Sequence, residues 1–165
     1  MTIRPLGPDD LAAWRAIRAE GLGLFPEAYL TTLEEELRQS DAEVAQRLEQ
    51  RLLLGAFDAD RLVGTAGLDP VGQQAAVAHR VALTAFYVSP DHHGTGTAAR
   101  LMRAAIAKAT QAGFLQAELY VAADNPRAIR FYEREGFVRH GVSPRAARVA
   151  GRFMDDLFYV RQLDG

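Results

Sequence analysis

The sequence predicts a mixed α/β fold with a partly antiparallel sheet. Two strand-like segments, Leu53 to Phe57 and Arg61 to Leu68, are separated only by the tight turn Asp58-Ala59-Asp60, which predicts an antiparallel hairpin. A strand–helix–strand unit follows in the middle of the chain, between residues 81 and 121. The expected order of elements is β, α, α, β, β, β, α, β, α, β, which is typical of mixed α/β proteins.

Proline, acidic residues and capping spacings indicate where helices begin, glycines indicate where they end, and β-branched and aromatic runs indicate strands. The expected strands are Thr2 to Leu6, Leu53 to Phe57, Arg61 to Leu68, Val81 to Val88, Leu115 to Val121 and Phe153 to Val160. The first expected helix begins at Pro8-Asp9-Asp10 and ends at Gly21 and Gly23. The second begins at Thr32, which has capping-box spacing to Glu35, and has a break near Ser40-Asp41. The third runs from the glycine loop at 93–98 to Gly113, and the fourth from Asn125-Pro126 to about Glu135.

The composition favours one globular domain over residues 1–165, located in the cytoplasm. The chain has no cysteine, so it forms no disulfide, cysteine-ligated zinc site or thiol nucleophile. Its formal net charge of −2 argues against binding to nucleic acid. No apolar run approaches the roughly 20 residues of a membrane span, and the N-terminus does not resemble a signal peptide. The four histidines are too scattered to predict a metal site, so no metal is expected.

The segment Val88 to Met102 (VSPDHHGTGTAARLM) places a strand, a glycine loop and a helix N-terminus in immediate succession. Gly94 and Gly96 let the backbone approach a ligand closely, and free N–H groups in the first helical turn favour an anion such as phosphate. Alternatively, such a loop only turns the chain. It matches neither the P-loop nor the Rossmann fingerprint.

A second segment, Val121 to Phe137 (VAADNPRAIRFYEREGF), begins a helix at Asn125-Pro126, with Asn as the cap and Pro at the first helical position. Tyr132 shares helical spacing with the apolar residues of this segment. From the residues alone, it is either a core aromatic or a phenol with a chemical role.

Together, the two segments resemble the Gcn5-related N-acetyltransferase (GNAT) superfamily. The acetyl-CoA loop of that family reads Q/R-x-x-G-x-G/A, which residues 93–98 match with His93 in place of Gln or Arg. The later family motif reads N-x-x-A-x-x-x-Y-x-x-x-G-F. Its fixed positions are all matched, by Asn125, Ala128, Tyr132, Gly136 and Phe137.

The resemblance implies acetyl-CoA as cosubstrate and a mixed, largely antiparallel sheet with helices on both faces around a strand–helix–strand core. It implies that Asn125 contacts acetyl-CoA and that Tyr132 lies at the thiol. The pantetheine arm would pair with the backbone of Phe86, Tyr87 and Val88, where two central strands splay apart. The pyrophosphate would be held by backbone amides of the loop after His93, namely those of Gly94, Thr95, Gly96, Thr97, Ala98 and Ala99.

The implied reaction is direct attack of an amine on the thioester. Deprotonating a lysine-like amine at pH 7 costs about 4 to 5 kcal/mol. Complete proton transfer from a phenol to a thiolate is uphill by about 2 kcal/mol, so Tyr132 is expected to donate a hydrogen bond. The strand Val81 to Val88 has no Glu, and Tyr120 stands where the ribosomal-protein acetylases carry one. The candidate bases are Glu118, His79, Glu27, Glu34 or a chain of waters.

A small amine is the expected acceptor, and a protein N-terminus or lysine is an alternative. A non-catalytic acyl-CoA-binding sensor is the alternative from another functional class, and the resemblance also predicts a homodimer. In the family, the two N-terminal helices line the acceptor side. Residues 26–49 carry seven acidic and two basic side chains, which predicts that this side attracts a cationic amine.

Overall fold

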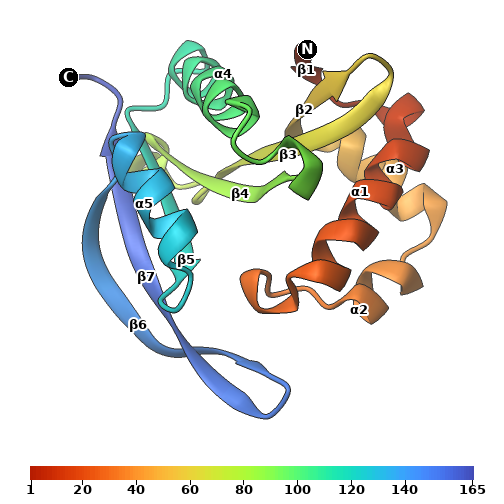
Figure 1. Ribbon diagram of the computed structural model, residues 1–165. Coiled ribbons are helices and arrows are strands. Elements are labelled where there is room, and N and C mark those ends of the chain that lie inside the picture. The colour runs from red at the N-terminus through yellow and green to blue at the C-terminus, as the bar shows by residue number, and fades with distance from the viewer.

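The computed structural model describes residues 1–165 and contains a seven-stranded sheet with helices on both faces (Figure 1). The strand order is β1-β2-β3-β4-β5-β7-β6, and only β4 and β5 pair in parallel. The strands are β1 (Thr2–Pro5), β2 (Leu52–Asp58), β3 (Arg61–Pro70), β4 (Arg80–Val88), β5 (Gln116–Ala122), β6 (Val138–Val149) and β7 (Arg152–Gln162). This confirms the mixed, largely antiparallel fold.

Five α-helices and four short 3-10 helices join the strands. The α-helices are α1 (Leu11–Leu24), α2 (Leu33–Arg38), α3 (Asp41–Gln50), α4 (Thr97–Gln111) and α5 (Pro126–Arg134). The 3-10 helices are η1 (Pro8–Asp10), η2 (Pro26–Ala28), η3 (Ala75–Val77) and η4 (Pro90–His92). The expected break near Ser40 is confirmed, because Thr32 and Ser40 each form a capping box and begin separate helices.

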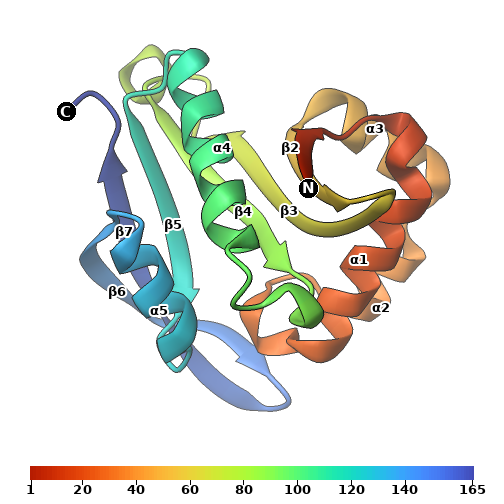
Figure 2. The same ribbon diagram turned by 45° about the horizontal axis from the view of Figure 1, so that its top comes forward.

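Each face of the sheet has its own apolar core, because successive side chains along a strand point to opposite faces. Leu53 of β2 packs with Trp14 of α1 and Leu48 of α3. Its neighbour Leu54 belongs to the core that includes Leu101 and the rest of the buried side of α4. Side chains of α5 pack against this second core. Figures 1 and 2 accordingly show α1–α3 on one side of the sheet and α4 and α5 on the other.

The parallel pair β4–β5 is short and then opens. Ladder pairing joins Arg80–Ala82 to Gln116–Glu118, and beyond these residues β4 pairs only with β3. The β3–β4 register shifts between Thr65 and Gly67, where Ala85 adopts φ +47°. Such a bulge bends a strand and increases its twist. The two central strands therefore diverge at their carboxyl ends, as the family resemblance implies.

Two features differ from the sequence-based expectation. Helix α1 continues through Gly21 and Gly23 to Leu24. A Cβ atom at Gly21 would lie 3.2 Å from the Tyr87 ring, so this glycine serves the packing of helix on sheet and does not end the helix.

The second difference is β6, a strand that was not predicted. Its sequence contains Gly141 and Pro144, which lie in two stretches where the β6–β7 register shifts. Proline and glycine are tolerated in strands at bulges and edges, and β6 is the edge strand of the sheet. The hairpin that β6 forms with β7 extends away from the rest of the fold (Figure 1).

Candidate active site

Two adjoining cavities open where β4 and β5 diverge. The large cleft, of about 1130 Å³, is lined by the loop before α4, the first turn of α4 and the inner side of α5. The small cavity, of about 380 Å³, lies against Thr84 of β4 and Glu118 of β5, on the face of the sheet that carries α1. Both cavities are lined by Glu27, Ala28, Tyr29, Phe86, Tyr120, Ala122 and Tyr132. These seven residues mark the junction of the cavities.

The loop at the mouth of the large cleft presents free backbone donors. Gly94 and Gly96 have φ values of +77° and +85°, in the left-handed region that favours glycine. The N–H groups of residues 94–99 donate no hydrogen bond within the chain, and the helical ladder begins with Arg100 N–H to Gly96 O at 3.0 Å. Consecutive free N–H groups at the positive end of a helix dipole favour an anion. The geometry therefore fits a pyrophosphate.

The threonine hydroxyls of this loop form hydrogen bonds within the loop. Thr97 is fully buried, and its hydroxyl lies 2.8 Å from that of Thr95. The Thr95 hydroxyl donates to His92 O at 2.7 Å, so Thr97 must be the donor to Thr95. Neither threonine lines the large cleft, whereas Gly94, Gly96, Ala98 and Ala99 do. Both hydroxyls are therefore already hydrogen-bonded within the loop, and neither threonine contributes to the lining of the cleft.

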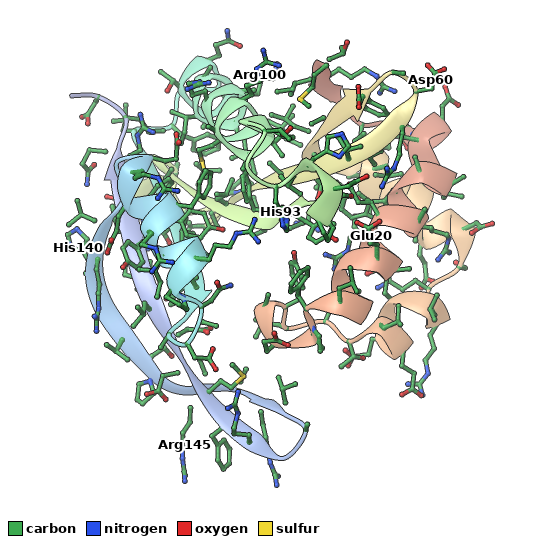
Figure 3. All side chains as sticks on the ribbon, in the orientation of Figure 1. Glu20, Asp60, His93, Arg100, His140 and Arg145 are labelled. Carbon is green, nitrogen blue, oxygen red and sulfur yellow. The ribbon has the colours of Figure 1, made fainter.

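The two adjacent histidines have different surroundings. Nε2 of His93 lies 2.7 Å from Val88 O, so His93 ties the loop to the end of β4 (Figure 3). His92 contacts the carboxylates of Asp91 and Asp58 at 2.9 and 3.1 Å. Their hydrogen bonds raise the pKa of the His92 imidazole. Both histidines line the large cleft, where His92 adds positive charge when protonated.

Helix α5 carries Tyr132 to the junction. The Asn125 side-chain oxygen accepts the Ala128 N–H at 3.1 Å and caps the helix, as the sequence predicts. The Tyr132 ring packs against Phe86 and Phe137, with centroids 6.1 and 6.0 Å away. Burial raises the pKa of the Tyr132 phenol, so the hydroxyl stays protonated at neutral pH. Tyr132 thus combines an aromatic packing role with a position at the junction.

The backbone of Phe86, Tyr87 and Val88 borders the large cleft, along the stretch of β4 that no longer pairs with β5. The Tyr29 hydroxyl donates to Phe86 O at 3.3 Å, which joins the segment directly after η2 to this edge. The Tyr87 hydroxyl instead donates to Glu20 at 2.7 Å, on the α1 side of the sheet. The expected pairing with the pantetheine arm therefore concerns only the backbone of Tyr87, because its phenol lies on the other side of the sheet.

The four candidate bases occupy different places. Glu118 lines the small cavity, but Arg80 donates two hydrogen bonds to it, both 3.0 Å long. His79 lines neither cavity, and Glu34 is an exposed partner of Arg38. Glu27 lines both cavities. Of the four, only Glu27 is a carboxylate at the junction that has no ion-pair partner.

Sequence reasoning missed Asp156 of β7. Its side chain is partly buried and lines the small cavity, and its carboxylate makes no hydrogen bond or ion pair with another residue of the chain. Burial, and to a smaller extent the charge of Asp155, raises the pKa of its carboxyl. The only signal in the sequence is the pair Asp155-Asp156 inside an apolar strand, where alternation requires one of the two to face inward.

The acidic side chains of residues 26–49 do not form a wall of either cavity. Glu35 and Glu43 complete capping boxes, Asp41 pairs with Arg15, and Glu36 is buried beside Arg18 and Arg47. Only Glu27 of the seven acidic residues lines either cavity. The expectation that the acidic residues of this run line the acceptor side was therefore wrong for all but Glu27, because capping and ion pairing use most of these carboxylates.

No group of three or more His, Asp or Glu side chains is arranged to hold a metal ion. None of the helices combines the length and the apolar character that a membrane span requires.

Comparison with known proteins gives the same picture as the geometry. The family model "Acetyltransferase (GNAT) family" matches residues 14–137. An uncharacterized N-acetyltransferase of Mycobacterium tuberculosis is 34% identical over 155 residues, covering 93% of this chain and 89% of the relative. A mycothiol acetyltransferase of Geodermatophilus obscurus is 33% identical over 137 residues, which are 81% of this chain and 42% of that protein.

A Salmonella typhimurium protein whose structure holds its cofactor acetyl-CoA superposes with a TM-score of 0.83 at 25% identity, covering 100% of this chain and 95% of that one. The family match, the relatives and the fold agree. The chain therefore belongs to the acetyltransferase (GNAT) family and is an acetyl-CoA-dependent N-acetyltransferase.

Proposed function

We propose that residues 1–165 form one catalytic domain that moves an acetyl group directly from acetyl-CoA to a small amine at Tyr132. The observation that carries this proposal is the junction of the two cavities. A donor in the large cleft and an acceptor in the small cavity meet only at the residues common to both, and Tyr132 is one of these.

The donor side of the proposal rests on backbone groups. The free N–H groups of residues 94–99 hold the pyrophosphate, and the exposed edge of β4 at Phe86 to Val88 accompanies the pantetheine arm. His93 sets the loop against β4, and Asn125 holds the start of α5 at the cleft. Bound acetyl-CoA supplies the thioester that the amine attacks.

Tyr132 donates a hydrogen bond to the sulfur of the leaving thiolate. Because burial raises the pKa of its phenol, full proton transfer is more unfavourable than the roughly 2 kcal/mol expected from unperturbed values. Hydrogen-bond donation without net transfer avoids this cost. The absence of cysteine agrees with a route that has no acyl-enzyme.

The size of the small cavity favours a small-molecule acceptor. At about 380 Å³, it is near the lower end of the range for small-ligand sites. The name of the Geodermatophilus relative, a mycothiol acetyltransferase, also supports a small molecule. A protein N-terminus or lysine would have to enter the same small cavity.

Thiol release from acetyl-CoA, measured over a panel of primary amines, tests the proposal. We expect release that depends on the amine and that is matched by formation of the N-acetylated product. A protein that binds acetyl-CoA but transfers to no amine in the panel would instead be an acyl-CoA sensor.

We further propose a homodimer and a cytoplasmic location. Support for the dimer comes from β6, an edge strand of 12 residues with exposed Val138 and Val142. A cytoplasmic location fits a cysteine-free chain that consumes acetyl-CoA. Light scattering at micromolar concentration tests the dimer, and a monomer would refute it.

A further inference from the structure

We propose that Asp156 binds the acceptor as an ammonium ion and removes its proton, acting as the general base of the reaction. This inference rests on the proposed function, since it assigns a role within the same site. It also defines the substrate class, namely a primary amine that is protonated at neutral pH.

The position of Asp156 follows from strand register. Its Cα partner on β5 is Ala122, which lines both cavities and so lies at their junction. On the other side, its β6 partner is Ser143. Asp156 thus lies opposite the junction, and its side chain lines the small cavity.

Glu118 lies on the same face of the sheet as Asp156, but at the end of the small cavity that is farther from the junction. It lies four residues before Ala122 on β5, which is about 13 Å along a strand. There it accepts both hydrogen bonds from Arg80, at the end where β4 and β5 are still paired. Glu118 is therefore bound to Arg80 at the end where β4 and β5 are paired. Asp156 lies at the end where these strands have separated, and its carboxylate is free to bind an acceptor.

The charged and titratable groups around Asp156 leave its carboxylate without a cationic partner. Asp155, on the same strand, faces away and is exposed. Glu27 of η2, Tyr29 directly after η2, Tyr120 of β5 and Tyr132 of α5 line the cavity with Asp156, and none carries a positive charge. The remaining titratable groups of the lining are Arg18, Arg51 and Glu118, of which Arg18 lies beside Glu36 and Arg51 pairs with Asp69.

A carboxylate that lacks a counter-ion and is partly removed from water favours an incoming ammonium ion. Burial raises the pKa of Asp156, which brings its basicity closer to neutral pH than that of an ordinary aspartate. Glu27 is exposed to solvent, which weakens both effects at its carboxylate.

Asp156 takes one proton from the ammonium ion and later releases it to water. The amine lone pair forms the new C–N bond, and the C–S bond breaks with its electron pair passing to sulfur. The second nitrogen proton is lost as the amide forms, and the thiolate, held by the Tyr132 hydrogen bond, gains one proton. The sum is ammonium plus thioester giving amide, thiol and one proton.

The pH profile of kcat/KM tests this role, using the amine that wild type acetylates fastest. For Asp156→Asn, we expect kcat/KM at pH 7 to fall by about 10² to 10³-fold, within the usual range for a general base. The loss should shrink as pH rises and the amine deprotonates in solution. Asp155→Asn is the matched control and should stay within about twofold, because it removes the same charge from the outward face. Binding of acetyl-CoA by calorimetry should be unchanged in both variants.

A second readout does not require turnover. In protein with ¹³C-labelled aspartate and bound CoA, the carboxyl signal absent from Asp156→Asn should titrate at a lower pH when propylammonium chloride is added, because the bound cation favours the carboxylate. An unperturbed signal would overturn the proposal, even if no amine in the panel is acetylated. Wild-type kinetics in Asp156→Asn, or the same loss in Asp155→Asn, would also overturn it. If Glu27→Gln alone shows the pH-dependent loss, Glu27 is the base.

Discussion

The ring of Tyr132 packs edge-on against the ring of Phe86, with centroids 6.1 Å apart. This contact joins α5 to the bulged end of β4, where β4 and β5 have already separated. It fixes a phenol at the junction of a cleft that fits acetyl-CoA and a cavity that fits a small amine. Substitutions in the donor loop, at Glu118 and Asp156 of the small cavity, and at this phenol each test one part of the site.

A negative charge in the first turn of α4 should abolish acetyl-CoA binding without unfolding the protein. Ala99 lines the large cleft at the third position of α4, where an acidic side chain favours the helix but repels a pyrophosphate. At a hundredfold excess over Kd, acetyl-CoA should stabilise wild type by about 2.7 kcal/mol, or roughly 5 to 10 °C in Tm. Thermal unfolding with and without acetyl-CoA should show no such shift for Ala99→Glu.

Ala99→Gln is the control for this variant, because it has the same size without the charge. It should keep more of the stabilisation than Ala99→Glu. Equal shifts in wild type and Ala99→Glu would mean that the loop only turns the chain. Gly96→Val is a poorer test, because φ of +85° would strain a valine whatever the ligand does.

Asp156→Asn should raise the Tm at pH 7. Because burial raises the pKa of Asp156 in the folded protein, the stability of wild type falls as pH rises through that pKa. Below the unfolded pKa of about 3.9, the carboxyl is protonated in both states and this penalty disappears. Differential scanning calorimetry at pH 7 and pH 3 should therefore show a gain for Asn at pH 7 that is smaller at pH 3. A lower Tm at pH 7 would mean that an ionised Asp156 stabilises the fold.

Glu118→Gln should affect stability more than catalysis. Its carboxylate is nearly buried and accepts both hydrogen bonds from Arg80, so Gln loses the charge-assisted pair. The urea midpoint should fall, while kcat/KM at saturating acetyl-CoA stays within about twofold and keeps the wild-type pH profile. A new pH dependence in this variant would restore Glu118 as a candidate base.

Local sequence signals predicted the parts of the site that depend on local structure. Asn125 caps α5, the glycine loop adopts positive φ, and Tyr132 falls on the inner side of its helix, because each depends on residues a few positions away. The divergence of β4 and β5 came from the family resemblance. Neither the composition of the chain nor its hydrophobic periodicity required this divergence.

The rest depends on partners that are distant in sequence. Arg80 neutralises Glu118 from 38 residues away, and Asp156 reaches the junction only through its register with Ala122. The role of Gly21 depends on Tyr87, which lies across the helix–sheet interface. β6 was missed because Gly141 and Pro144 are typical of loops, and only pairing with β7 makes them part of a strand.

The most direct test of the account is the kcat of Tyr132→Phe for amine-dependent thiol release, measured beside the Kd for acetyl-CoA. Removing the hydroxyl keeps the packing on Phe86 but deletes the hydrogen bond to the leaving sulfur. We predict a kcat lower by about 10 to 10⁴-fold with an acetyl-CoA Kd close to that of wild type. Tyr159→Phe, which removes a phenol that donates to Glu133 outside both cavities, should leave kcat nearly unchanged. If single-turnover measurement shows that chemistry limits the rate, an unchanged kcat in Tyr132→Phe would contradict the account. Tyr132 would then be a core aromatic residue with no role in catalysis.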